Sequence, residues 1–133
     1  IGIGTLAVHA ETVRHEIGDT PVLAVLAAGR GEIYGQSFAA DGAAEGPAEA
    51  AAPETFARRI AANTLIAGSG AAALAAILGD EARARTVHEQ SAPDIAALCR
   101  LALVTSPTGE PPRPLYLRPP DAKPQTTGRI ARQ

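Results

Sequence analysis

The feature that most constrains the fold is an unbroken apolar run over residues 22–26, followed closely by Gly29-Arg30-Gly31. A strand without polar alternation is usually covered on both of its faces. The two glycines permit the positive φ angles that a tight reversal requires. We therefore predict a β-hairpin over residues 22–38, with its first strand buried in a sheet on which helices pack.

Helical spacing before the hairpin predicts the first of these helices. Its apolar side chains recur at intervals of four, three and four residues, which places them on one face: Leu6, Ala10, Val13 and Ile17. Gly18 suits the position just after a helix. Residues 1–3 look like the end of a strand.

Shorter elements are expected after the hairpin. Residues 48–52 form either a third strand at the sheet edge or a loop, and Pro53 suits the first turn of a short helix. Residues 65–67 are predicted as a buried strand, residues 71–78 as a helix, and residues 85–87 as a further short strand. Strands that precede alternating strand and helix units indicate an α/β fold, a mixed sheet flanked by helices.

A last helix is predicted between Ser91 and Pro107. Ser91 with Asp94 three residues later resembles a capping box, and Pro107 ends the helix. Its predicted apolar face contains Ile95, Leu98, Cys99 and Ala102.

The segment Gly68-Ser69-Gly70 is the candidate binding site. A strand, a glycine-rich turn and a helix N-terminus form the arrangement that binds phosphate in many proteins. The segment has neither the Lys-Ser/Thr of a P-loop nor a full GxGxxG. The alternative is that these glycines let the helix pack closely on the sheet.

The remaining chemically capable side chains predict no catalytic or metal site. His9 and His15 lie six residues apart, which does not place them on one helical face, and we expect both at the surface. Cys99 falls on the apolar face of the last helix, so we expect a buried structural thiol rather than a nucleophile. We accordingly expect no catalytic residue, no metal and no cofactor.

Composition and charge limit the partners. Alanine supplies 30 of the 133 residues, so the core must be thin. Residues 1–110 hold 7 basic and 13 acidic groups, and residues 111–133 hold 5 basic and 1 acidic group. An acidic body argues against autonomous binding of nucleic acid. The basic tail is either a phosphate contact or, as we expect, a solvated end.

Cysteine content and apolar segments indicate the compartment. A single cysteine excludes an internal disulfide, and a reduced cytoplasmic protein is the simplest interpretation. The longest apolar stretch, residues 65–78, is too short to span a bilayer, so we expect no membrane association. The absence of methionine predicts a fragment or a processed chain.

The tail carries a resemblance to a known family. Residues 114–123, PLYLRPPDAK, resemble the C-terminal signature of the bacterial TsaB (YeaZ) family. The hairpin segment Gly31-Glu32-Ile33-Tyr34 is similar to the end of that family's DARxGEVY-like turn. Residues 1–6, IGIGTL, resemble its entry to the second lobe, and residues 67–70, AGSG, its strand-turn-helix unit. No segment resembles the family's GPGSFTGLR-like first half, so the resemblance concerns the second lobe only.

The hairpin departs from the family pattern at two positions. Ala27 stands where the family often has Asp, and Gly29 stands where it often has Arg. Whatever that acidic and basic pair does in relatives is not expected of this chain.

The resemblance implies an RNase H-like lobe of the actin-like ATPase superfamily, called ASKHA. It implies a non-catalytic scaffold and activator of the threonylcarbamoyl transferase TsaD, with the ATPase TsaE as a further partner, in modification of tRNA. A homodimer is left open. Two alternatives also remain: a nucleotide-binding lobe that uses Gly68, Ser69 and Gly70, and a glycoprotease-like hydrolase, the older label of the family.

Two regions are expected along the chain. Residues 1–113 form the lobe, and residues 114–133 form an extended tail, because Pro114 and Pro119 exclude a helix between them. We expect Leu115 and Leu117 to pack on the body and the chain to be mobile after about residue 123.

Overall fold

The computed structural model describes residues 1–107 and 109–118 of the chain. Its centre is a five-stranded sheet in the order β3-β2-β1-β4-β5. The strands are β1 (Val22–Gly29), β2 (Glu32–Phe38), β3 (Glu49–Ala51), β4 (Leu65–Ala67) and β5 (Thr86–His88). β1–β2 and β2–β3 are antiparallel pairs, whereas β1–β4 and β4–β5 are parallel. The sheet is therefore mixed, as predicted.

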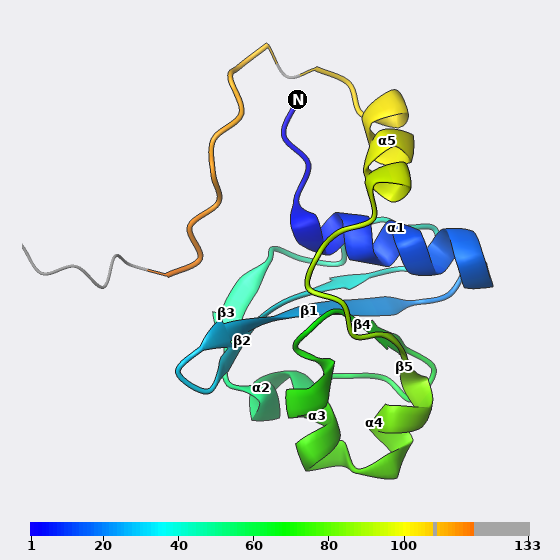
Figure 1. Ribbon diagram of the computed structural model, residues 1–133, viewed down its shortest axis with the longest axis vertical. Helices are drawn as coiled ribbons and strands as arrows, with labels where there is room; N and C mark the ends of the chain where they lie inside the picture. The colour runs from blue at the N-terminus through cyan, green and yellow to red at the C-terminus, as the bar shows by residue number, and fades with distance from the viewer. Residues whose placement is uncertain (108, 119–133) are drawn as a thin grey trace, which may run out of the picture.

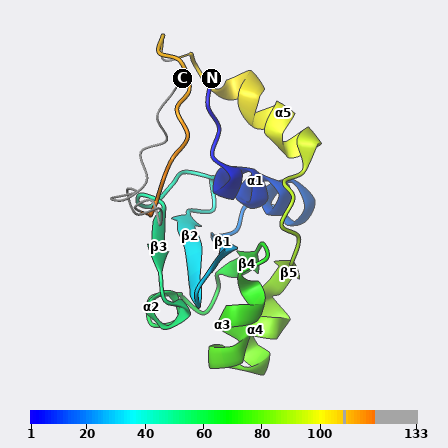
Figure 2. The ribbon, with the colours of Figure 1, turned by 60° about the vertical axis from the view of Figure 1, so that its left-hand side comes forward.

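The helices form layers around this sheet. They are α1 (Thr5–Ile17), α2 (Pro53–Ala57), α3 (Ala71–Leu78), α4 (Asp80–Arg85) and α5 (Ile95–Val104). Figures 1 and 2 show α1 on one face of the sheet and α2, α3 and α4 on the other. α5 packs on α1, on the side away from the sheet (Figure 1).

The central strand β1 contributes to two separate cores. Leu23 and Val25 pack with residues of β2, α2, β4, α3 and α4 on one face of the sheet. Val22 and Ala24 pack against the apolar face of α1 on the other. Successive side chains of a strand point to opposite faces. The apolar run is unbroken because both faces are buried.

The hairpin turn lies where the glycines predicted it. Gly29, Arg30 and Gly31 have φ angles of 74°, 55° and 77°, three consecutive residues in the left-handed region. Glycine adopts such angles without steric cost, whereas Arg30 does not. The register between β1 and β2 shifts at Ala27/Gly29, next to this turn.

Two local predictions are wrong, and one helix was missed. Residues 1–4 contain no strand. α5 begins at Ile95, because the carboxylate of Asp94 accepts hydrogen bonds from the N–H groups of Ala96 and Ala97, each at 3.1 Å. Asp94 is thus the N-cap itself rather than the third residue of a box that begins at Ser91. α4 was not predicted, since its six residues carry little apolar periodicity.

The C-terminal segment differs from the expectation in its packing. Residues 109–118 contain neither helix nor strand. Leu117 is half-buried, but Leu115 is 73% exposed, so the prediction that both leucines pack on the body is wrong for Leu115. The predicted mobility after about residue 123 lies outside the described residues.

His9 is buried next to Ser91 of the β5–α5 connection rather than exposed, so the sequence prediction of a surface histidine is wrong. Its side chain is 4% exposed, and its Nε2 atom has no hydrogen-bond partner. Burial lowers the pKa of His9, the nearby His88 lowers it further, and a backbone contact with Ser91 acts in the opposite direction. Desolvation disfavours the charged imidazolium, so His9 is held neutral in the folded protein.

This burial predicts a loss of stability in mild acid. The unfolded chain takes up a proton on His9 near its ordinary pKa of about 6.5, while the folded chain does so only at lower pH. Above about pH 6.5, His9 is neutral in both states and does not change the free energy of unfolding. Below that pH, protonation of the unfolded chain lowers the free energy of unfolding by up to roughly 1.4 kcal/mol per pH unit. Urea unfolding at about pH 7.5 and pH 5.5 should show a smaller loss for His9→Gln than for the parent. The exposed His15→Gln variant is the control, and an equal loss in all three proteins would contradict this account.

Candidate functional site

The glycine turn Gly68-Ser69-Gly70 connects β4 to α3 beside the end of β1. The N–H groups of Gly68, Gly70 and Ala71 donate to the carbonyls of His88, Val25 and Gly68 at 2.7, 3.1 and 3.1 Å. The hydroxyl of Ser69 accepts a hydrogen bond from the N–H of Ala27 at 3.2 Å. A phosphate group at this turn would have to compete with these internal hydrogen bonds.

Close packing explains why the turn contains glycine. Gly68 has a φ angle of 108°, and a Cβ atom there would lie 2.1 Å from the carbonyl oxygen of Val25. A Cβ atom on Gly70 would lie 3.1 Å from Val25 Cβ and 3.2 Å from Ile33 Cγ2. The geometry therefore favours the structural interpretation of the turn over a phosphate site.

The C-terminal segment reaches the hairpin through Arg118. Its Nη1 atom donates to the carbonyl oxygen of Ala28 at 3.0 Å, and its Nη2 atom forms an ion pair with the carboxylate of Glu32. Both side chains are partly shielded from water. Arg118 thus connects the two strands of the hairpin, on either side of the turn. Sequence analysis did not predict this contact, because the two partners are 86 residues apart.

The two positions that depart from the family pattern lie at the same end of the sheet. The N–H of Ala27 is bound to Ser69, and Gly29 occupies the left-handed region at the start of the turn. The small side chain of Ala27 contributes no charge to this hairpin end. Glu32 and Arg118 form an ion pair at this end.

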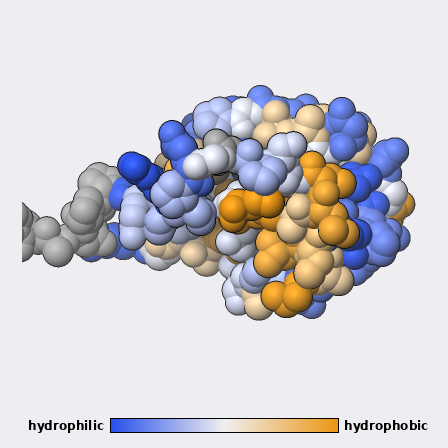
Figure 3. Space-filling model, turned by 90° about the horizontal axis from the view of Figure 1, so that it is seen from above, coloured by the Kyte–Doolittle hydropathy of each residue, from blue (hydrophilic) through white to orange (hydrophobic). Residues whose placement is uncertain are grey.

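The outer face of α5 is an exposed apolar surface. Leu103 and Val104 are 87% and 80% exposed, and Ile95 is 66% exposed. Cys99 is also exposed, so the predicted buried thiol is wrong. We call Ile95, Cys99, Leu103 and Val104 the α5 surface. Figure 3 views the molecule from the end at which α5 lies in Figure 1 and shows hydrophobic residues gathered on that face. Exposed apolar patches mark interaction sites in many proteins.

The face of α5 that packs on α1 is only partly apolar: Leu98 and Leu101 are half-buried, whereas Ile95 is exposed. Ala97 is buried there, and Arg100 donates from Nε to the buried carboxylate of Glu11 at 3.1 Å. Glu11 also accepts from Arg14 Nε at 2.9 Å. These polar contacts hold the helix in an orientation that apolar periodicity alone does not predict.

The histidines form no metal site in the part of the chain that the structure describes, where no group of three potential ligands occurs. His88 pairs with Glu16 through Nε2 at 2.9 Å, which connects β5 to the end of α1. His9 is buried and His15 is exposed. Within residues 1–107 and 109–118, no helix is long and apolar enough to cross a membrane.

The structural role of Gly68 predicts a large effect of a small substitution. Gly68→Ala would place Cβ against the Val25 carbonyl, so β1 or the turn must move. Gly79→Ala is the matched control, because Gly79 also has a positive φ angle, of 69°, but open space around it. Chemical unfolding should show a loss near 1 kcal/mol for Gly79→Ala and a clearly larger loss for Gly68→Ala. Equal losses would contradict close packing at Gly68.

The Arg118 contact predicts coupling between tail and hairpin. Arg118→Ala and Glu32→Gln should each lower the free energy of unfolding, because each removes one partner of the ion pair. A double-mutant cycle in urea unfolding should return a coupling of roughly 0.5–1 kcal/mol. Arg113→Ala, a change at an exposed arginine of the same segment, is the control. Full additivity of the two changes would show that the pair is not formed in solution.

Comparison with known proteins supports the fold. No protein-family model and no curated protein matches the sequence. One similar structure is described as an uncharacterized protein with similarity to peptidase YEAZ from Pseudomonas aeruginosa, with 24% identity and a TM-score of 0.65 over 87% of this chain. A second is YeaZ from Pseudomonas aeruginosa, with 23% identity and a TM-score of 0.54 over 75% of this chain.

The matched regions make up 57% and 47% of those two chains, so this chain spans about half the length of the structures that it matches. The predicted fold class, an α/β lobe with a mixed sheet flanked by helices, is confirmed. The chain has the fold of part of these YeaZ structures.

Proposed function

We propose that this chain is the second lobe of a TsaB (YeaZ) family protein, which acts as a non-catalytic scaffold and activator. In this proposal, it supports a TsaD-like transferase that places threonylcarbamoyl on tRNA, together with a TsaE-like ATPase. The whole protein would contain a further lobe, in keeping with the greater length of the similar YeaZ structures.

The observation that carries this proposal is the contact of Arg118 with Glu32. Arg118 belongs to the tail segment PLYLRPPDAK, and Glu32 belongs to the hairpin segment GEIY. These two segments carry the sequence resemblance to the family. Their contact gives a physical reason for both segments to occur in one chain, because each supplies one charge of the same ion pair.

The arrangement of side chains supports the non-catalytic part of the proposal. One of the similar structures is named for its similarity to a peptidase, YEAZ. In this chain, His88 pairs with Glu16, and Nε2 of His9 has no partner. Among residues 1–107 and 109–118, no histidine forms a hydrogen bond with a serine hydroxyl or with Cys99. Such a bond is the usual sign of a nucleophile that is activated by an adjacent base.

The glycine turn bears on the nucleotide-binding alternative. The N–H groups of Gly68, Gly70 and Ala71 already donate to carbonyls within the protein. If the chain is a scaffold, we therefore expect it to bind ATP weakly and to hydrolyse neither ATP nor peptides. Micromolar affinity for ATP-Mg²⁺ in a calorimetric titration would favour the alternative.

Reconstitution of tRNA modification tests the proposal. The transferase, the ATPase and the threonylcarbamoyl-AMP synthase are combined with tRNA and either this chain or a longer polypeptide that joins it to a first lobe. Mass spectrometry of the digested tRNA measures the threonylcarbamoyl nucleoside. We expect modification with the longer protein and none above background with this chain alone, because a scaffold must hold its partners through both lobes.

The control reaction omits the candidate protein and sets the background. Modification with this chain alone at the level of the longer protein would contradict the need for two lobes. No modification with the longer protein, while a TsaB protein of known activity works in the same assay, would contradict the proposed function itself.

A further inference from the structure

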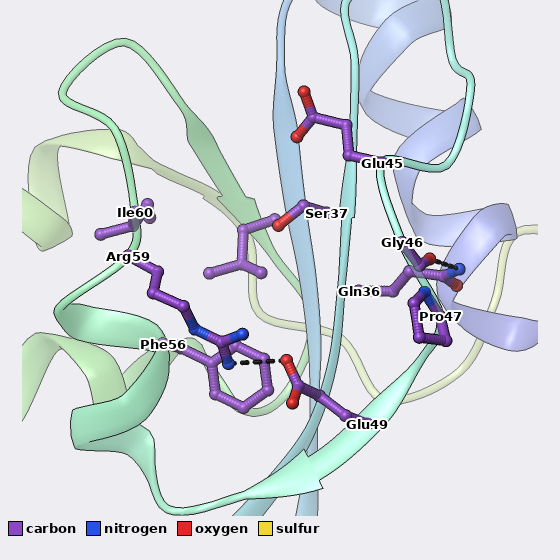
Figure 4. A pocket seen from close by; sticks show the side chains of 10 residues that line it. Gln36, Ser37, Glu45, Gly46, Pro47, Glu49, Phe56, Arg59 and Ile60 are labelled. Atoms are coloured by element: carbon purple, nitrogen blue, oxygen red, sulfur yellow. Dashed lines mark hydrogen bonds and ion pairs between the residues drawn. The ribbon is translucent and has the colours of Figure 1, made fainter.

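A pocket of about 400 Å³ lies between the sheet, α2 and the connection from β2 to β3. Figure 4 shows the side chains around it. β1 and β2 provide one wall, the turn that follows α2 provides a second, and residues 45–49 provide the third. The residues that matter for its chemistry are Leu23, Ser37, Glu45, Glu49, Phe56 and Arg59. The glycine turn and the α5 surface do not line it.

The pocket exists because two successive residues on one face of β2 are small. The ring of Phe56 lies directly on Gly35, where a Cβ atom would come within 2.4 Å of Cε1. Ser37, the next residue on that face, is exposed, and α2 is only five residues long. Leu23 and Phe56, which are 2% and 4% exposed, close the pocket on its inner side, and the half-buried Ile60 provides its accessible apolar side chain. A cavity of this size suits a small ligand.

Among the described residues, one basic side chain lines the pocket, and its charge is already paired with a carboxylate. Nη2 of Arg59 pairs with Glu49 at 2.6 Å, and its Nε donates to the carbonyl of Thr55 at 3.2 Å. The guanidinium also lies 5.3 Å from the centroid of the Phe56 ring. An anion would gain little from an arginine held in this way, and it would face the carboxylates of Glu45 and Glu49.

Glu45 supplies a negative charge that no basic side chain of the pocket neutralises. Among the described residues, its carboxylate takes part in no ion pair or side-chain hydrogen bond, and it stands at the rim of the pocket (Figure 4). The hydroxyl of Ser37 is a second polar group in the same wall. With two carboxylates and one arginine, the lining carries a net charge of −1. The pocket thus combines an apolar surface with an acceptor-rich, acidic rim.

We propose that this pocket binds a primary alkylammonium group. The alkyl chain packs on Ile60, and the ammonium donates charge-assisted hydrogen bonds to Glu45 and to the Ser37 hydroxyl. A free aliphatic amine and the side chain of a lysine present the same chemistry. This site is independent of the proposed scaffold role.

Titration of the chain followed by two-dimensional amide NMR tests the proposal. The probes are n-butylammonium chloride and a lysine blocked at both its amino and its carboxyl ends; 1-butanol and sodium butyrate are the neutral and anionic controls. We expect both ammonium probes to shift the amides of Ser37, Gly46 and Ile60 with millimolar affinity, as befits ligands of few atoms. Binding of n-butylammonium without binding of the blocked lysine would support the proposal and identify the ligand as a free amine.

Charge variants separate this site from general attraction to an acidic protein. Glu45→Gln should weaken binding roughly threefold or more, because it removes the uncompensated carboxylate. Glu89→Gln makes the same change at an exposed residue just after β5, at the opposite edge of the sheet, and should leave affinity unchanged. The amide spectrum of each variant reports whether it is folded. Equal binding by 1-butanol, equal affinity in Glu45→Gln, or shifts outside the pocket alone would overturn the proposal.

Discussion

Burial of β1 on both faces is the constraint on which the other elements depend. Each of its inner residues, Val22 to Val25, is at most 2% exposed. One face requires α1, and the other requires the helices between β3 and β5. A chain with so much alanine has few large side chains, so the loss of either covering layer would remove a large share of its apolar burial.

The end of β1 also brings together the segments that carry the family resemblance. Ser69 binds the backbone of Ala27, and Arg118 binds the carbonyl of Ala28 and the carboxylate of Glu32. In consequence, the glycine turn and the tail are both attached to the hairpin. The glycines act here through close packing, because the carbonyl of Val25 occupies the space that a side chain on Gly68 would need.

In the part of the chain that the structure describes, two surfaces are candidates for binding partners or ligands, and they differ in shape and charge. The α5 surface is apolar and convex, as an exposed helix must be, and suits contact with protein. The pocket beside α2 is small and has an acidic rim, which suits a single charged group. The two surfaces share no residue, so occupation of one need not exclude occupation of the other.

The sequence by itself determined the hairpin, the helix that covers it and the strand-turn-helix unit around Gly68, since apolar periodicity and glycine positions act over short distances. Only the tertiary structure decided that His9 is buried, that Cys99 is exposed and that Arg118 reaches Glu32. These outcomes depend on which face of a helix meets a neighbour distant in the chain. In α5, Arg100 meets Glu11 of α1, while Ile95 and Cys99 of the predicted apolar face are exposed; local periodicity does not predict a contact between residues so far apart in the chain.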